Sequence, residues 1–364
     1  MNTGFLNQIP REIAALDDYA AYAKNNLSAE AWAYIAGASA DEYTLEYNAK
    51  AYSEIKLLNT VLTDVSHGHT QTQLLNETLA HPIITAPVAY QKLAHPDAEI
   101  ATAMAAQAQD GLFVLSTLAS TTIEDIVQKT QGPRWFQLYF QNTKQQTLEL
   151  IQRAKAAGFS AIMVTVDSPI NGLRNREQRS GFSLPAGVAA VNCQQVLTPN
   201  PIKQGESQVF QGFMSKAPSW QDIEWLMKNT DLPVLIKGII NPKDAQKAQQ
   251  IGASGIVVSN HGGRTLDTLP SPIEVLPQIA AITDYKLPLI VDSGIRRGSD
   301  IFKAIALGAS AVMIGRPIFY ALATAGALGV AHAIRLLRDE LELTMALCGC
   351  ATLADISQDA IWQK

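Results

Sequence analysis

The segment Ser259-Asn260-His261-Gly262-Gly263-Arg264 places an imidazole, two adjacent glycines and an arginine within one short stretch of chain. Histidine changes its charge near neutral pH, which suits it to act as a general base. The glycines allow a flat ligand to approach the backbone closely, and Arg264 can bind a carboxylate through two parallel hydrogen bonds. A lone histidine is more often a satisfied core residue, but the position of His261 at the end of a predicted strand favours a site.

A second group of residues suited to chemistry follows the last two predicted strands. It comprises Val291-Asp292-Ser-Gly-Ile-Arg296-Arg297-Gly298 and Ile314-Gly315-Arg316-Pro317. The glycines would expose backbone N–H groups, and the arginines would add positive charge, which together suit a phosphate group. The alternative is a pair of surface arginines, and Arg297 alone fits that description.

Polar side chains stand at nearly every other predicted strand end. A charged side chain at the end of a core strand costs several kcal/mol unless it is paired or bound to something. One such residue would carry little meaning, whereas a polar group at nearly every strand end indicates a site. The residues concerned are Ser116, Thr117, Gln137, Tyr139, Thr165, Asp167, Lys237 and Asp292.

Short apolar, β-branched runs alternate with stretches of helical periodicity, which is typical of a parallel sheet. Eight such units predict an α/β fold, a closed (β/α)8 TIM barrel, with an open doubly wound sheet as the alternative. We expect one domain over 1–364, in which 1–80 form a mostly helical N-terminal cap and 183–218 form a long, mobile lid loop after strand 4. The predicted strands are 83–89, 113–117, 134–140, 161–167, 233–239, 255–261, 287–293 and 311–315.

Composition narrows the function classes for these 364 residues. A formal charge of -5 argues against a nucleic-acid surface. The three cysteines favour reduced thiols and a cytoplasmic location. We expect no secretory signal in 1–15, no stretch close to the roughly 20 apolar residues of a membrane span and no metal site, since no pair of acidic residues stands at ligand spacing.

The motifs together resemble the FMN-dependent α-hydroxy acid oxidase and dehydrogenase family, which includes glycolate, lactate and mandelate-oxidising enzymes. The likeness runs from about Leu27 to Asp355. It extends to Thr85-Ala-Pro-Val-Ala89, Trp135-Phe-Gln-Leu-Tyr139 and Thr165-Val-Asp-Ser-Pro169. The resemblance implies a (β/α)8 barrel that binds FMN and oxidises an L-2-hydroxy acid.

The resemblance also implies a role for each matching residue. His261 would remove a proton from the substrate, and Asp292 would pair with His261. Arg264, Arg174 and Tyr34 would hold the substrate carboxylate, while Tyr139 would bond to the reacting oxygen. For the flavin ring, the resemblance implies Lys237 beside the pyrimidine end, Ala89 at the reactive edge, and Ser116, Gln137 and Thr165 along the ring. For the rest of the cofactor, it implies Ser259 near the ribityl chain and Arg296 near flavin and phosphate. Gly315 and Arg316 would lie at the phosphate itself.

The departures from this pattern bear on the substrate. Leu118 replaces the tryptophan of plant-type glycolate oxidases, which predicts a roomier pocket. Val88-Ala-Tyr90-Gln-Lys resembles mandelate-oxidising members, whereas Asp292-Ser293-Gly294, in place of the commoner Asp-Gly-Gly, resembles lactate oxidases. We expect L-lactate as substrate, with larger or aromatic L-2-hydroxy acids as the alternative.

The electron acceptor and the assembly follow from the same resemblance. The 183–218 loop has only Lys203 and Lys216 as bases and no continuous apolar run, so membrane docking is not expected. Oxygen, reduced to hydrogen peroxide, is therefore the expected acceptor, with a dehydrogenase as the alternative. By analogy with relatives we expect a homotetramer. A phosphate-binding barrel without redox chemistry is a more distant alternative, because it would not need His261, Arg264 and Arg174 together.

Overall fold

Eight parallel strands close into a barrel in which each strand pairs with the next along the chain and the last pairs with the first. The computed structural model describes residues 4–193 and 198–363. This closed barrel confirms the predicted (β/α)8 fold and excludes the open sheet. The barrel strands are β3 (Ile83–Thr85), β4 (Leu112–Ser116), β5 (Arg134–Leu138), β6 (Ile162–Thr165), β7 (Val234–Ile239), β8 (Gly255–Val258), β9 (Leu289–Val291) and β10 (Ala311–Ile314).

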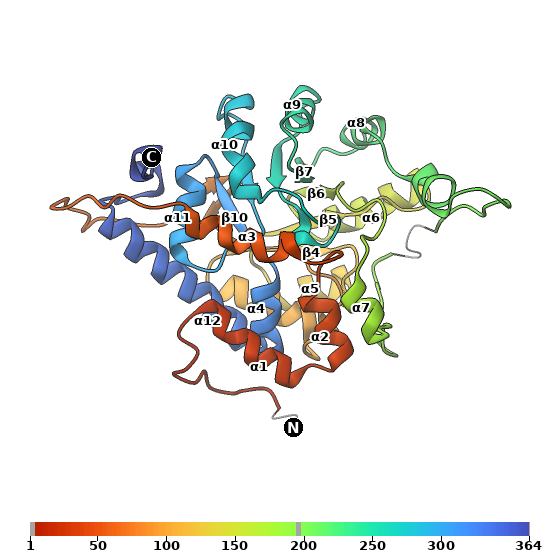
Figure 1. Cartoon of the computed structure of the whole chain (residues 1–364), viewed down its shortest axis with the longest axis horizontal. Coiled ribbons are helices and arrows are strands. Elements are labelled where there is room, and N and C mark those ends of the chain that lie inside the picture. The colour runs from red at the N-terminus through yellow and green to blue at the C-terminus, as the bar shows by residue number, and fades with distance from the viewer. Residues whose placement is uncertain (1–3, 194–197, 364) are drawn as a thin grey trace.

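Each barrel strand is followed by a helix that covers the outside of the barrel. Figure 1 shows α8, α9 and α10 along one side of the barrel and α1, α2, α4 and α12 along the opposite side. The helices are α1 (Tyr19–Asn26), α2 (Ala29–Ala36), α3 (Tyr43–Glu54), α4 (Ala98–Ala108), α5 (Ile123–Lys129), α6 (Lys144–Ala156), α7 (Asn175–Ser180), α8 (Trp220–Lys228), α9 (Pro242–Gln250), α10 (Pro272–Ile282), α11 (Gly298–Ala306) and α12 (Arg316–Leu347).

Most strand positions are apolar because both faces of each strand are covered. Strand β6 is buried at every position, as expected for a parallel strand between a barrel interior and a helical layer. Several helix starts follow from local sequence. At α9, for example, the side chain of Asn241 accepts a hydrogen bond from the Lys243 N–H, and Pro242 occupies the first helical position.

The N-terminal 80 residues are helical only in part. Helices α1 to α3 lie in this segment, but residues 72–79 form an antiparallel hairpin of β1 (Thr72–Leu74) and β2 (Glu77–Leu79). Leu74 and Leu79 belong to the same buried cluster as interior barrel residues such as Trp135. The hairpin therefore closes the end of the barrel opposite to the polar strand ends, and residues 1–80 are less helical than predicted.

Helix α12 is the one helix among residues 4–193 and 198–363 that is long and apolar enough to cross a membrane by length and composition. The sequence predicts no stretch close to a membrane span, and by length and composition this prediction is wrong. Most of its apolar window, 72%, is buried inside the protein, and the helix is kinked at Ala325 and Gly326. These features are those of a core helix that packs against the barrel.

The segment between β6 and α8 is long and contains little regular structure. It holds α7, a π-helical turn at Gln208–Phe213 and a 3-10 turn at Met214–Lys216. The predicted 183–218 lid includes residues 194–197, which lie outside the described residues, and its mobility stays a prediction. In Figure 1 part of this green segment projects away from the barrel.

Candidate functional site

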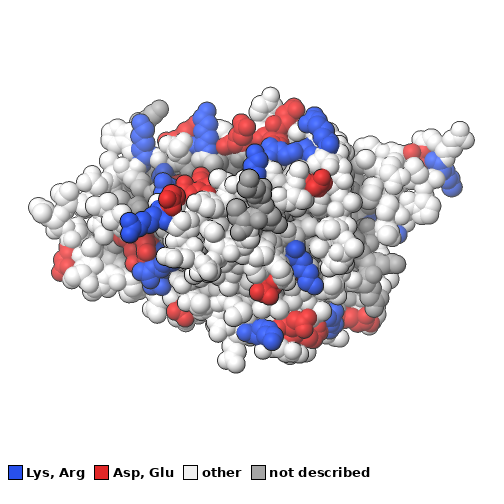
Figure 2. Space-filling view, turned by 90° about the horizontal axis from the view of Figure 1, so that it is seen from below, with Lys and Arg blue, Asp and Glu red and all other residues white. Residues whose placement is uncertain are grey.

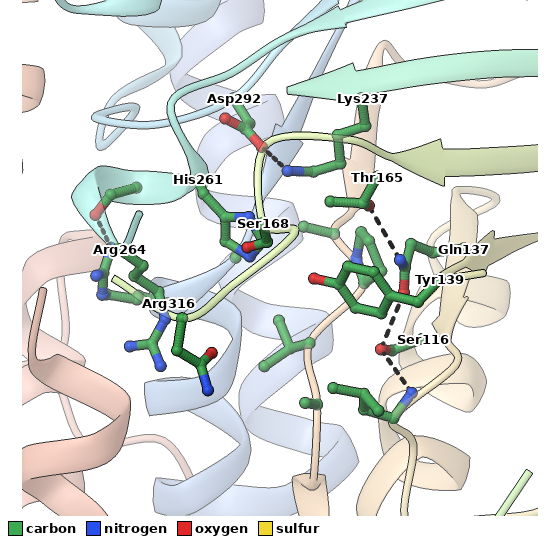
Figure 3. A pocket seen from close by; sticks show the side chains of 18 of the residues that line it. Ser116, Gln137, Tyr139, Thr165, Ser168, Lys237, His261, Arg264, Asp292 and Arg316 are labelled. Carbon is green, nitrogen blue, oxygen red and sulfur yellow. Dashed lines mark hydrogen bonds and ion pairs between the residues drawn. The ribbon is translucent and has the colours of Figure 1, made fainter. Parts of the chain in front are cut away.

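One cavity of about 560 Å³ lies at the C-terminal ends of the barrel strands, within the range of about 300–1,000 Å³ typical of ligand sites. Figure 3 shows side chains from several strands converging on it. Fourteen of the predicted residues line it, namely Tyr34, Ala89, Ser116, Gln137, Tyr139, Thr165, Arg174, Lys237, His261, Arg264, Asp292, Arg296, Gly315 and Arg316. Ser259 lies behind the wall, completely buried.

The acidic partner of His261 is Asp167. The His261 Nδ1 atom lies 2.9 Å from Asp167 Oδ1, which corrects the expected pairing of His261 with Asp292. Burial lowers the pKa of His261, and the attraction of Asp167 offsets only part of this effect. Burial alone would raise the pKa of Asp167, but its contact with His261 and the charge of Lys237 hold the pKa of this carboxyl below its usual value. The pair is therefore a neutral imidazole beside a carboxylate at neutral pH.

Asp292 pairs instead with Lys237, at 3.1 Å between Oδ2 and Nζ. Both side chains are almost fully buried. Burial disfavours the charged form of Lys237, but Asp292 and Asp167 outweigh this penalty and raise its pKa. Lys237 also donates to Ser259 Oγ at 3.0 Å. The cavity wall thus includes a buried lysine that its two carboxylate neighbours keep in the charged form.

The geometry of a barrel explains this exchange of partners. Side chains that point into a barrel form layers, and each layer is contributed by alternate strands. Asp167 and His261 follow β6 and β8, whereas Lys237 and Asp292 belong to β7 and the end of β9. Pairing therefore skips one strand in each case. Asp167 was already among the polar strand ends, and the alternate-strand rule is the signal that could have assigned it to His261.

A row of hydrogen-bonding side chains crosses β4, β5 and β6 at the cavity wall. Ser116 Oγ donates to Gln137 Oε1 at 3.1 Å, and Gln137 Nε2 donates to Thr165 Oγ1 at 3.0 Å. The dashed lines in Figure 3 trace this row. All three residues are buried, so the row can present polar atoms along one edge of a flat ligand.

Two arginines hold the C-terminal end of α2 against the site. Arg264 donates to the carbonyls of Tyr34 and Gly37, at 2.7 and 3.0 Å. Arg316 donates to the carbonyls of Ile35, Gly37 and Gly262, at 3.2, 2.8 and 2.8 Å. The last carbonyls of a helix have no partner within it and attract positive charge. These bonds therefore fix Tyr34, the Gly262 loop and Arg264 relative to one another.

This arrangement bears on the expected phosphate contact of Arg316. Its guanidinium donates to three carbonyls, and the backbone N–H groups of residues 315 and 316 offer further donors to a phosphate at this position. Those groups begin α12, and the first N–H groups of a helix lack internal partners. Nearby, Arg296 Nε lies 2.7 Å from Asp17 Oδ1, which leaves other N–H groups of this guanidinium available.

The substrate side of the cavity combines aromatic rings with a third arginine. Tyr34 stacks on Phe182 with ring centroids 4.5 Å apart, and Arg264 lies 5.0 Å above the Tyr34 ring. Arg174 forms a 3.4 Å ion pair with Glu177, and its buried Nε has no partner within the described protein. Burial and, to a lesser extent, the negative charge of Asp167 raise the pKa of Tyr139, so the Tyr139 hydroxyl keeps its proton. Sequence reasoning missed Phe182 and Glu177, which follow no barrel strand directly.

Within residues 4–193 and 198–363, no group of three or more His, Cys, Asp or Glu side chains is placed to hold a metal ion. The chemistry of the cavity therefore has to be read from its imidazole, carboxylates, arginines and lysine. A neutral base beside three cations suits removal of a proton from an anionic, flat-bound substrate.

Comparisons with known proteins agree with this reading. Residues 23–363 match the family described as FMN-dependent dehydrogenase. The chain is 45% identical over 357 residues to an L-lactate oxidase of Alicycliphilus denitrificans, covering 98% of each chain. It is 40% identical to glycolate oxidase 1 of Zea mays, covering 96% of each chain. A solved mandelate oxidase with (S)-2-phenylpropionate superimposes with a TM-score of 0.88 at 37% identity, over 96% of this chain and 98% of that one. The chain therefore belongs to the FMN-dependent dehydrogenase family of flavin enzymes.

Proposed function

We propose that this protein is an FMN-dependent oxidase of small L-2-hydroxy acids, with L-lactate as its preferred substrate. The observation that carries the proposal is the pairing of Asp167 with His261, which lines the same cavity as Arg264 and Arg174. A base, its acidic partner and two cations for a carboxylate are what oxidation of a 2-hydroxy acid requires.

The cavity fits FMN. The row of Ser116, Gln137 and Thr165 offers polar atoms to one edge of the flavin ring, and Lys237 offers positive charge. Arg296 and the N-terminal end of α12 suit the phosphate. At Gly294 the chain passes close to the backbone of α3, because a Cβ at this position would lie 2.1 Å from the Asn48 carbonyl oxygen. When bound, FMN supplies the acceptor for the two electrons that leave the substrate.

The protein's own residues bind and orient the substrate and move its proton. Nδ1 of His261 is engaged by Asp167, so Nε2 is the nitrogen available to take the proton. Asp167 then stabilises the imidazolium that forms. Arg264 is fixed by two carbonyls, and the unpartnered Nε of Arg174 offers a further donor to the substrate carboxylate.

Two observations favour L-lactate as the preferred substrate. The stacked pair Tyr34 and Phe182 narrows the substrate side of the cavity, and L-lactate oxidases of two bacteria are 45% and 46% identical to this chain. A second candidate is an aromatic acid such as mandelate. Leu118 and Tyr90 line the same cavity and would accept a ring, and the solved mandelate oxidases share the fold.

The test is anaerobic stopped-flow absorbance of the flavin with L-lactate, D-lactate and (S)-mandelate, followed by air and a peroxide assay. We expect the fastest bleaching with L-lactate, none with D-lactate, and peroxide after air enters. Faster bleaching with (S)-mandelate would reverse the order of substrates. Bleaching without recovery in air would replace the oxidase by a dehydrogenase.

We further propose a cytoplasmic homotetramer. The three cysteines are free thiols, which is usual in a reducing compartment. Around 56–68 the chain presents Val61, 69% exposed, and Leu62, fully exposed, and on α12 Leu343 and Leu347 are exposed as well. Such apolar groups favour burial against another subunit. The face in Figure 2 carries small groups of both signs between wide uncharged areas. Light scattering after size exclusion tests the mass, and a monomer would refute it.

A further inference from the structure

Ser293 follows the aspartate at the end of β9 and adopts a left-handed backbone conformation, with φ of 71°. This conformation suits glycine and disfavours a residue with a Cβ. A strained residue persists when the surrounding structure compensates for it, and such residues gather at functional sites. The compensation at Ser293 lies in its hydroxyl group.

The Ser293 hydroxyl joins two loops of the site. It donates to Asp292 Oδ1 at 2.7 Å and accepts a hydrogen bond from the Gly262 N–H at 3.0 Å. Asp292 is the partner of Lys237, and Gly262 directly follows His261. One hydroxyl therefore contacts both the charged pair and the loop that carries the base.

These bonds are part of a closed ring of polar groups. From Ser293 the ring passes through Asp292 to Lys237, and Lys237 donates to Ser259 Oγ. Ser259 Oγ also accepts from the His261 N–H at 3.0 Å, and the next N–H along the chain returns to Ser293. The backbone N–H groups on both sides of the imidazole-bearing Cα are thus held by serine hydroxyls.

The ring also explains how His261 keeps its own unusual backbone. His261 and Gly262 both have positive φ, 57° and 62°. A histidine in this region needs external support. Ser259 holds the first of these residues and Ser293 holds the second, so the direction of the imidazole depends on both hydroxyls.

We propose that Ser293 is a positioning residue, whose hydroxyl fixes the Asp292 carboxylate and the His261–Gly262 backbone in one arrangement. It thereby controls the direction of the base and the positive field that Lys237 presents to the flavin. Without the hydroxyl, the full charge of Asp292 faces Lys237 and that field weakens. The kinetic part of this inference rests on the proposed function, whereas the flavin-binding part does not.

The test compares Ser293→Ala, which keeps the Cβ and removes the hydroxyl, with Ser293→Gly, which also relieves the left-handed strain. Asp284→Gly is the matched control, because Asp284 has φ of 52° and an exposed side chain outside the cavity. Each FMN-loaded variant is titrated with sulfite, which adds reversibly to oxidised flavin and leaves negative charge on the ring. Its dissociation constant therefore reports the positive field near the ring.

Both Ser293 variants should bind sulfite about tenfold more weakly and reduce their flavin about tenfold more slowly than wild type, which is the lower end of the effect of losing one hydrogen bond to a charged group. Asp284→Gly should match wild type in both. Ser293→Gly places glycine in a conformation that favours it, so its thermal midpoint should stay close to wild type.

Wild-type sulfite affinity and reduction rate in Ser293→Ala would overturn the proposal. A change in Ser293→Gly alone would also overturn it, because backbone strain and not the hydroxyl would then be responsible. If no 2-hydroxy acid reduces the wild-type flavin, the proposed function fails, while the sulfite titration still decides the role of Ser293.

Discussion

Replacing Asp167 by asparagine should separate two roles of this residue, the hydrogen bond that orients His261 and the negative charge that stabilises its protonated form. The side chain keeps its shape and its hydrogen bond to His261 Nδ1 across 2.9 Å, but loses the negative charge. The imidazole is neutral before proton transfer and cationic after it, so the lost charge matters most in the transition state. Asp167→Asn should therefore bind substrate almost normally and react slowly.

The size of the effect follows from the contact. A hydrogen bond to a charged group contributes about 1.5–3 kcal/mol, and each 1.36 kcal/mol of barrier corresponds to about tenfold in rate. We expect flavin reduction in Asp167→Asn to be slower by about 10- to 150-fold. Asp231→Asn is the control, since Asp231 forms an exposed ion pair with Lys155, and such pairs contribute little.

The pH dependence provides a second readout with a defined sign. The wild-type base is active while His261 is neutral, so reduction should be lost as pH falls through a pKa below the usual histidine value. Asp167 raises that pKa, hence Asp167→Asn should move the acidic limb to lower pH while lowering the plateau. Stopped-flow reduction across pH measures both. An unchanged plateau, or a limb that moves to higher pH, would refute the pairing.

The remaining predictions use the same flavin assay unless stated. Asp292→Asn should tighten sulfite binding, because it removes the negative charge that opposes the field of Lys237, its 3.1 Å partner. It should leave the acidic limb of the pH profile in place; a limb that moves would show that Asp292 acts on His261. Arg264→Lys should lower kcat/KM by about tenfold or more, because lysine cannot reproduce the two-carbonyl contact and bind a carboxylate as a fork; an unchanged kcat/KM would place the carboxylate elsewhere. Limited proteolysis should cut first within 183–218 and leave the barrel intact, and early cuts confined to other segments would show that this loop is well packed.

Much of the fold could be predicted because barrel strands have a strong sequence signal. All eight predicted strands are present, since apolar β-branched runs such as 161–167 have few other solutions. The predicted C-terminal limit agrees for β7, and for the other seven strands it lies one to four residues beyond the observed end. Polar residues that end these runs can lie beyond the sheet, as Asp167 does after β6, where its side chain lies beside His261.

The errors share one cause, which is that sequence order does not give side-chain partners. His261 and Asp292 follow neighbouring strands, yet inward-pointing side chains meet across alternate strands, so Asp167 is the partner. Similarly, the strands of the hairpin at 72–79 are too short to show a clear alternation of apolar and polar residues. The position of the hairpin depends on its packing against the interior of the barrel.

The central claim is that His261 starts the oxidation of a 2-hydroxy acid by a protein-bound flavin. The most direct measurement mixes FMN-loaded wild type and His261→Ala anaerobically with L-lactate and follows flavin absorbance. We predict that wild type bleaches rapidly, whereas His261→Ala retains its FMN and stays oxidised on the same time scale. Bleaching of His261→Ala at a rate near wild type would contradict the claim, because another group would then have to remove the proton.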